Sequence, residues 1–482
     1  MALAADRRNV NPFAPYAARL TWLTAAFVTA FCALIATIGA DAQWLAALGH
    51  AIVSLGRIPH GVPYAAAPTA GWENVPVLGE LIFHGLEAGF GDRGLVLVQT
   101  VAVAIALGVT ALDMRRGEAA DAPSALVLLL VAVASAASLL VVRAQVFSLA
   151  LFPVVVVLLR AQARAPSWRI WLLVPLFALW ANLHGGVLVG AAVAGAYLIV
   201  HRLRYQPVLA LSVLVASVAA LFSTPSLLGT GDYYRGVLFS EAAAKGEGLW
   251  APLSASSPFD VVFVLVVLAL LCLALSSRPQ LWELIALAGL VAMAAHVGRN
   301  GVWLAFFIAA PAAWGITGSR PWRLRMPRSL TAIVAVALLA LVATGLTRTP
   351  APPAAGKPLR LAAARASGTS PILADDINAE ALALDGRTVW IANPLDAFGR
   401  RQQRLYLDWI SGRQAGDALL APARAVLVTL GEAAQGRLAR SRAWREERRD
   451  ARAVLYVRAD GTRYRAAGWQ SPPSTASSST GS

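Results

Sequence analysis

Long apolar runs separated by short polar segments fill most of the chain. A helix needs about 20 apolar residues to cross a bilayer, and somewhat shorter runs suffice in a crowded bundle. By that measure we predict about eleven membrane-spanning helices, near residues 20–40, 94–112, 123–142, 146–160, 170–183, 185–200, 207–222, 260–276, 280–296, 302–316 and 329–346. Residues 20–346 are therefore predicted to form the transmembrane domain of an α-helical polytopic membrane protein.

The pattern changes after the last apolar run. Residues 347–370 are rich in proline, alanine and glycine, which is typical of a linker. Between residues 371 and 466 the strand-like segments "PILADD", "TVWIANP", "ARAVLVTLG" and "ARAVLYVR" alternate with the helix-like segments "DAFGRRQQRLYLDWISG" and "EAAQGRLARSRAWREERRD". This alternation predicts a small α/β domain with a mostly parallel sheet. The serine-rich tail, residues 467–482, is predicted to be disordered.

Composition agrees with a membrane protein. The 482 residues are 58% hydrophobic and 14% charged, whereas soluble domains carry about 25% charged residues. The net charge of +15 could suggest a nucleic-acid partner, but the basic residues lie in loops beside apolar runs or in the tail. Membrane topology explains the loop charges, so we expect no nucleic acid. Cys32 and Cys272 both lie in apolar runs, which excludes a disulfide framework or a cysteine-based metal site.

The placement of arginines predicts how the protein is oriented in the membrane. Arginines are concentrated in every second segment between the runs, beginning with the N-terminal segment 1–19. Because positive charge is retained on the cytoplasmic side, the N-terminus is expected inside. An odd number of spans then places the C-terminal domain outside the cytoplasm. The two longest loops, residues 41–93 and 223–259, fall on the outer side, where long structured loops usually form a site.

Ionisable residues gather on this predicted outer side. They are the histidines His50, His60, His84, His184 and His296 and the first-loop acids Asp41, Glu73, Glu80 and Glu87. Ionisable groups near a membrane are functional candidates by default. The alternative is that each is an interfacial side chain whose polar end reaches water.

Asp41, Arg143 and Arg299 each lie where a predicted span ends. Asp41 could cap the helix that follows it, or could deprotonate an acceptor hydroxyl during glycosyl transfer. Arg143 and Arg299 could bind lipid phosphates in general, or could clamp the phosphate of one polyprenyl-phosphate donor, since the planar guanidinium fits phosphate oxygens bidentately.

The segment "LFALWANLHGGVLVGAA" at residues 177–193 places polar side chains inside an apolar run. The predicted topology puts Asn182 and His184 in the outer turn between two spans, with Gly185 and Gly186 allowing close packing. His184 could hydrogen-bond a sugar or a phosphate, or could satisfy backbone groups at a broken helix end.

Several short elements resemble a group of bacterial polytopic membrane proteins that are similar to GT-C class glycosyltransferases. The matching elements are spread thinly over most of the chain, and the "W-x-N-L-H-G-G" element is the most specific. In the first outer loop the matches are Asp41, Trp44, Gly49, Gly56, Arg57, Ile58 and Pro59. In "RAQVFS" they are Arg143, Gln145, Phe147 and Ser148, while Ala144 departs from the usual proline. Later matches are Trp180, Asn182, Leu183, His184, Gly185, Gly186, Thr224, Pro225, Arg299 and Asn300.

The resemblance implies a membrane glycosyltransferase in the bacterial cytoplasmic membrane. Its donor would be a polyprenyl-phosphate-linked sugar, and its acceptor a lipid or glycan on the outer face. In GT-C enzymes an acidic residue of the first outer loop is the catalytic base, which implies Asp41. The expected substrate contacts are Arg143, Gln145, Asn182, His184, Arg299, Asn300, His50 and Glu80. Some GT-C enzymes use a divalent cation, but the first-loop spacing matches no metal motif, so we assign no metal ligands.

One departure supports a different function. The group often has a second aspartate after the Ile-Pro pair, whereas this chain has "IPHGVPYAAAPT", with His60 as the nearest titratable residue. A non-catalytic membrane protein, either a lipid-carrier flippase or an assembly partner in the cell envelope, is therefore the alternative. A small-solute transporter is disfavoured, because the polar residues cluster on one face and not at the membrane midplane.

Overall fold

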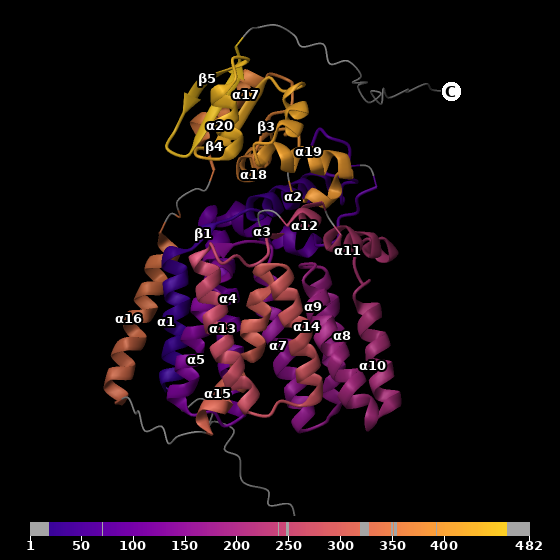
Figure 1. The fold of residues 1–482 in the computed structure, drawn as a ribbon, viewed down its shortest axis with the longest axis vertical. Helices are drawn as coiled ribbons and strands as arrows, with labels where there is room; N and C mark the ends of the chain where they lie inside the picture. Colours follow the sequence, from indigo (N-terminus) through magenta and orange to yellow (C-terminus); the bar gives the residue numbers. More distant parts are fainter. Residues whose placement is uncertain are drawn as a thin grey trace, which may run out of the picture.

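The protein is a helical bundle with a small α/β domain beyond one end (Figure 1). The computed structural model describes residues 19–69, 71–239, 241–246, 250–318, 327–348, 350, 354–391 and 393–459. The predicted disordered tail, and the predicted N-terminal segment apart from Arg19, lie outside these residues. We call the end of the bundle that carries the α/β domain the capped face.

The bundle confirms the predicted α-helical polytopic membrane fold. Within the described residues, 6 helical segments are long and apolar enough to cross a membrane. They are α4 (Asp92–Arg116), α7 (Val146–Arg164), α9 with η3 and η4 (Val187–Ala196, Tyr197–His201, Arg202–Arg204), α13 (Pro258–Ser276), η7 with α15 (Gly298–Asn300, Gly301–Thr317) and α16 (Arg328–Thr347). The shorter apolar segments that cross the bundle are α1 (Arg19–Ile35), α5 (Asp121–Ala134), η2 with α8 (Trp168–Leu172, Leu173–Ala181), α10 (Pro207–Ala220) and α14 (Leu281–His296), and α6 (Ala136–Leu140) follows α5. Each lies over a span that the hydrophobic pattern predicts.

Helix α15 lies at the centre of the bundle. Every residue from Gly301 to Ala313 is buried. The peripheral helices instead expose apolar side chains, such as Val208 on α10, Leu265 on α13 and Ile333 on α16. Apolar surface of this extent on the outside of a bundle is expected where lipid replaces water.

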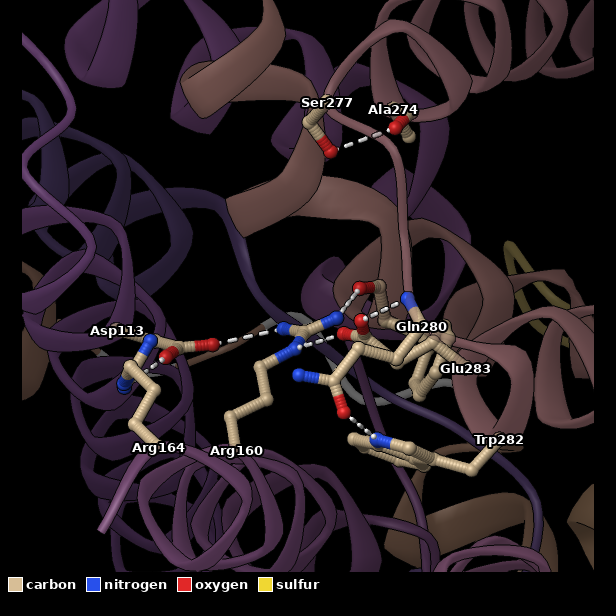
Figure 2. Close-up of polar contacts among 9 residues, drawn as sticks. Asp113, Arg160, Arg164, Ala274, Ser277, Gln280, Trp282 and Glu283 are labelled. Atoms are coloured by element: carbon tan, nitrogen blue, oxygen red, sulfur yellow. Dashed lines mark hydrogen bonds and ion pairs between the residues drawn. The ribbon is translucent and has the colours of Figure 1, made fainter. Parts of the chain in front are cut away.

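A buried ion network joins four helices near the end opposite the capped face. Figure 2 shows the Arg160 guanidinium between the carboxylates of Asp113 on α4 and Glu283 on α14, at 2.7 and 2.9 Å. The third guanidinium nitrogen donates to the Phe307 carbonyl oxygen on α15 at 2.8 Å. Because Arg160, Asp113 and Glu283 are all buried, these contacts satisfy charges that would otherwise be costly in the bundle.

Two helices of the first long loop lie across the capped face (Figure 1). They are α2 (Ala42–Leu55) and α3 (Val77–Phe90). They approach so closely at Gly49 that a Cβ there would collide with the Glu80 carbonyl. The second long loop contributes η5 (Leu227–Gly229), α11 (Thr230–Leu238) and α12 (Glu241–Lys245) to the same face.

The C-terminal domain is α/β, as predicted, but its sheet is mixed and not mostly parallel. Its helices are α17 (Lys357–Ser367), α18 (Asp376–Leu384), η8 (Leu395–Ala397), α19 (Arg400–Ile410), η9 (Gln414–Leu420) and α20 (Ala433–Arg440). Its strands are β3 (Leu373–Ala374), β4 (Ala425–Thr429), β5 (Trp444–Arg449) and β6 (Ala453–Arg458), in the order β3-β4-β6-β5. Among the pairings of these four strands, only β3–β4 is parallel, and β6 is antiparallel to both of its neighbours.

Two local features explain the differences from the predicted domain. In the segment predicted as one long helix, helix α20 ends at Arg440 and the second half forms β5. The Asp450 side chain accepts hydrogen bonds from the N–H groups of Arg452 and Ala453, which builds a tight turn from β5 to β6. Helix α17 lies within the range predicted as linker, and its buried Leu359 and Ala363 pack in the domain core.

The predicted strand "TVWIANP" connects the domain to the first long loop. Val389 bridges both Ile372 and Ala65 in parallel. The Val389 N–H donates to the Tyr64 carbonyl at 2.9 Å, and the Ala66 N–H donates to the Val389 carbonyl at 2.9 Å. These backbone hydrogen bonds fix the C-terminal domain against the first loop at the capped face.

Candidate functional site

A two-stranded parallel pairing brings Asp41 close to Arg143. Strand β1 (Thr37–Ile38) pairs with β2 (Val141–Val142), and the Gly39 N–H extends the pairing to the Val142 carbonyl at 3.0 Å. In a parallel pair both strands end on the same side, so the residues that follow them become neighbours. A Cβ at Gly39 would lie 2.3 Å from Val141 Cγ1 and 3.1 Å from Arg143 Nε, so a glycine is needed where the two strands meet.

The Asp41 carboxylate does not cap α2. Asp41 occupies the N-cap position with φ 81°, and its side chain makes no capping hydrogen bond. Its backbone N–H donates to both carboxylate oxygens of Glu380, at 2.7 and 2.9 Å. A positive φ is uncommon outside glycine, although aspartate tolerates it better than most residues. Contacts from the C-terminal domain therefore hold Asp41 in an unusual backbone conformation.

Two arginines act on the Asp41 carboxylate. Burial raises the pKa of Asp41, the positive charges of Arg143 and Arg299 oppose that rise, and Asp376 adds to it. Arg143 Nε is buried and has no hydrogen-bond partner among the described residues. The Arg299 guanidinium lies over the Trp250 ring, 3.8 Å from its centroid. The site thus combines a carboxylate with two cations that can accept an anionic ligand.

The C-terminal domain supplies carboxylates that the sequence reasoning missed. Helix α18 begins directly after β3 and carries Asp376 and Glu380 to Asp41. Glu380 also accepts a hydrogen bond from Asn393 Nδ2 at 2.8 Å. The signal was the acidic run "ADDINAE" directly after a predicted strand, where polar side chains often gather at a sheet edge. Its relation to Asp41 depends on domain docking, which the local pattern does not show.

His184 holds its own turn through one ring nitrogen. Nδ1 accepts the Gly186 N–H at 3.0 Å and lies 2.6 Å from Ser148 Oγ, which in turn accepts the Trp180 indole N–H at 2.7 Å. Burial, with the charge of Arg299, lowers the pKa of His184 to about 4. The ring is therefore neutral at pH 7, and because Nδ1 accepts, Nε2 carries the proton.

The glycines after His184 make room for side chains. A Cβ at Gly185 would lie 2.9 Å from the Tyr233 hydroxyl on α11, and a Cβ at Gly186 would lie 2.5 Å from Ser148 Oγ. Tyr233 was not among the predicted site residues. It lies near the charges of Asp396, Glu80 and Asp41, so the second long loop also reaches this site.

Three of the predicted substrate contacts, Asn182, Gln145 and Asn300, lie at helix ends. Asn182 Nδ2 donates to the carbonyls of Ala178 at 2.8 Å and Ser223 at 2.7 Å, so it ties the end of α8 to the segment after α10. Gln145 and Asn300 occupy the N-cap positions of α7 and α15 without a side-chain capping hydrogen bond. Their positions in the chain place them beside Arg143 and Arg299.

Glu80 and His50 have different surroundings from Asp41. Glu80 is buried on α3 and accepts a hydrogen bond from Asn74 at 2.6 Å, and burial raises its pKa to about 8. The His50 ring packs edge-on against His84, with centroids 5.2 Å apart. This contact between α2 and α3 places His50 in a separate group.

Metal ligation has little support in the described part of the chain. There, no three His, Cys, Asp or Glu side chains are grouped so that they could hold a metal ion. The first-loop histidines and acids are distributed over several groups, and none of these groups is a ligand set.

Comparison with known proteins gives the fold. No family model and no curated protein sequence matches the chain. The crystal structure of apo ArnT from Cupriavidus metallidurans superposes with a TM-score of 0.51 at 14% identity, covering 92% of this chain and 96% of that one. The chain has the ArnT fold. The crystal structure of the same ArnT bound to undecaprenyl phosphate gives a TM-score of 0.48 at 14% identity, covering 90% of this chain and 97% of that one.

This similarity confirms the GT-C-like architecture that the sequence elements predicted. At 14% identity it concerns the fold alone. The function must therefore be argued from the residues that this chain places at its capped face.

Proposed function

We propose that this protein is a membrane glycosyltransferase that moves a sugar from a polyprenyl-phosphate donor to a lipid or glycan acceptor. The observation that carries the proposal is the half-buried Asp41, whose carboxylate interacts electrostatically with Arg143 and Arg299 at the capped face of a bundle with the ArnT fold. The capped face would lie outside the cytoplasmic membrane of a bacterium, with the N-terminus inside.

The proposed reaction uses three charged groups, Asp41, Arg143 and Arg299. Asp41 accepts the proton of the acceptor hydroxyl as the hydroxyl oxygen attacks the anomeric carbon of the donor sugar. The bond between that carbon and the phosphate oxygen breaks, and the polyprenyl phosphate leaves with the electron pair. Arg143 and Arg299 stabilise the negative charge that develops on the phosphate. The raised pKa of Asp41 makes its carboxylate a stronger base than an exposed aspartate.

Neighbouring polar groups would orient the donor. His184 is neutral and presents Nε2–H as a hydrogen-bond donor to a sugar or phosphate oxygen. Gln145 and Asn300 would add contacts beside the arginines. Asn182 would act through the turn it ties, because both of its documented hydrogen bonds go to backbone carbonyls.

The missing second acid of the first loop has replacements at this site. His60 is exposed on the first loop and lines a separate cavity. Asp376 and Glu380 instead supply carboxylates close to Asp41 from the C-terminal domain. The non-catalytic lipid-carrier function remains the alternative, and lipid binding without any sugar transfer would favour it.

Undecaprenyl phosphate binding tests the role of the arginines. We expect Arg143→Ala and Arg299→Ala each to weaken binding to the purified full-length protein about ten-fold or more, since each removes a charge-assisted hydrogen bond. Lysine should restore only part of the affinity, because it lacks the planar fork. Native mass spectrometry of the protein in nanodiscs can measure the bound fraction.

Arg235→Ala is the matched control for this experiment. Arg235 is an exposed arginine at the same face, paired with Asp232 on its own helix. Its loss should leave lipid binding unchanged. If Arg143→Ala and Arg299→Ala bind as well as Arg235→Ala, the proposed phosphate site is wrong.

Glu380 is predicted to position Asp41. Glu380→Ala removes both acceptors of the Asp41 N–H and should lower kcat roughly ten-fold or more, because small displacements of a reacting group are costly. Glu380→Gln keeps an acceptor oxygen and should recover most of the rate. The donor KM should change little in either variant, as measured by transfer of radiolabelled sugar from the lipid-linked donor. Equal losses in the alanine and glutamine variants would contradict a positioning role.

A further inference from the structure

A separate cavity lies at the capped face where the two long loops meet. Its volume is about 130 Å³. The lining residues come from two parts of the first loop and from the segment after α10, and they are Ile58, Pro59, His60, Trp72, Glu73, Asn74, Pro225 and Ser226. None of the proposed donor contacts is among them.

The cavity wall contains a buried acceptor that lacks a donor. Asn74 is 3% exposed. Its Nδ2 donates to Glu80 at 2.6 Å, which fixes the amide, while its Oδ1 is buried without a partner in the described residues. The backbone around it is also held, because Ser226 Oγ donates to the Asn74 carbonyl at 3.1 Å. An unpaired buried acceptor destabilises the folded protein, and a ligand hydroxyl would relieve that cost.

The other side chains define the ligand class. Trp72 offers an aromatic face, and Glu73 offers further acceptor oxygens at the rim. Among the lining residues there is no lysine or arginine, so the cavity lacks the cations that a phosphate group requires. A flat aromatic surface with fixed hydrogen-bond acceptors suits a ring that has apolar C–H faces and hydroxyl edges, as in an uncharged saccharide.

Trp72 connects this cavity to the Asp41 site. Its indole N–H donates to Asp396 Oδ2 on η8 at 3.3 Å. Burial raises the pKa of Asp396 to about 6, and the charge of Asp41 adds to that rise. Asp396 thus interacts with both a cavity residue, through a hydrogen bond, and Asp41, through its charge.

We propose that the cavity lined by Trp72, Asn74 and Glu73 binds an uncharged saccharide unit of the acceptor. This inference rests on the proposed function, which it deepens by naming the acceptor class. The hydroxyl edge would meet Asn74 Oδ1 and Glu73, and the ring face would stack on Trp72. A saccharide held there would direct the rest of the acceptor past Asp396 toward Asp41.

Saturation-transfer NMR on the full-length protein in nanodiscs tests the cavity directly. The probes are the methyl glycosides of glucose, mannose, galactose and arabinose, with glucose 6-phosphate for comparison. We expect saturation transfer to the ring protons of at least one neutral glycoside. Trp72→Leu should weaken that binding about ten-fold or more, because it removes the aromatic face on which the ring would stack. Trp72→Phe, which keeps an aromatic face, should retain most of it.

Trp168→Leu is the matched control, because Trp168 is an exposed tryptophan (73%) on the short helix η2, away from the cavity. Glycoside binding should be unchanged in this variant and in Arg143→Ala. The proposal is overturned if no neutral glycoside binds, if only glucose 6-phosphate binds, or if Trp72→Leu binds as the unmodified protein does.

The results also separate this inference from the proposed function. Suppose that Arg143→Ala and Arg299→Ala leave undecaprenyl phosphate binding unchanged, while a glycoside binds and Trp72→Leu weakens its binding. The transferase proposal then fails and the saccharide site stands. If lipid binding and sugar transfer behave as expected while Trp72→Leu alters neither glycoside binding nor transfer, the saccharide site alone is wrong.

Discussion

Replacing Asp41 by asparagine should lower the rate of sugar transfer by roughly 10²- to 10⁴-fold, the usual contribution of a general base. Asparagine has nearly the same shape as aspartate and keeps the backbone N–H that donates to Glu380, so the α2 turn should be retained. It cannot accept a proton at neutral pH. Removing the negative charge that interacts with Arg143 and Arg299 should not weaken the binding of the donor phosphate.

The measurement is transfer of radiolabelled sugar from a lipid-linked donor in membranes that contain each variant, beside undecaprenyl phosphate binding. Asp41→Asn should lose transfer and keep lipid binding. Unchanged transfer by Asp41→Asn would remove Asp41 as the base. Loss of both transfer and lipid binding would indicate that Asp41→Asn fails to assemble the site. In that case Asp41→Glu, which keeps a carboxylate, provides the test of the base, and it should retain part of the transfer activity.

The pH dependence gives a second readout of the same group. A general base works in its ionised form, so transfer should fall as the pH drops through the pKa of Asp41. Burial raises this pKa above the ordinary value for aspartate, which is about 3.9. The acid limb of the pH–rate profile should therefore lie above that value. The residual rate of Asp41→Asn should lack this limb.

Breaking the buried Arg160 network should produce the largest loss of stability. Arg160→Ala leaves the Glu283 carboxylate without its cation in the helix bundle and leaves Asp113 with only the more distant Arg164, at 3.4 Å. Removing one partner of a buried ion pair typically costs about 3–5 kcal/mol, because the remaining charge stays buried. Thermal unfolding of the detergent-solubilised protein, followed by intrinsic fluorescence, should show a markedly lower Tm.

Two further variants show whether buried charge is the cause. The triple replacement Arg160→Met, Asp113→Leu and Glu283→Leu removes all three charges and should recover much of the lost stability. Arg235→Ala breaks an exposed pair with Asp232 and should change stability by about 1 kcal/mol or less. An Arg160→Ala protein that unfolds like Arg235→Ala would show that the network contributes little.

The order of helices, and the face on which several candidate site residues lie, could be predicted without the structure. Crossing a membrane requires an apolar run of fixed length, so the spans and the loops between them follow from local composition. Alternation of the spans then assigns each loop to one of two faces. This is why Asp41, Arg143 and Arg299, at the ends of three different spans, could be placed on the same face.

Which of those residues touch each other was not predictable in the same way. Asp41 meets Arg143 because of a pairing only two residues long between β1 and β2, which is too short to leave a periodic pattern. His50 was grouped with Asp41 by face, yet it packs against His84 between α2 and α3. The segment predicted as a continuous helix became β5 because a turn at Asp450 allowed it to pair with β6.

By itself, therefore, the sequence determined a polytopic membrane bundle, an α/β domain after it, and one face rich in acids, arginines and histidines. Only the tertiary structure decided that the C-terminal domain docks on that face through Val389 and Ala65 and sets Glu380 against the backbone of Asp41. The physical reason is range. Hydrophobic spacing acts along the chain, whereas the contacts that build the site join residues that are distant in sequence, 339 positions apart in the case of Asp41 and Glu380.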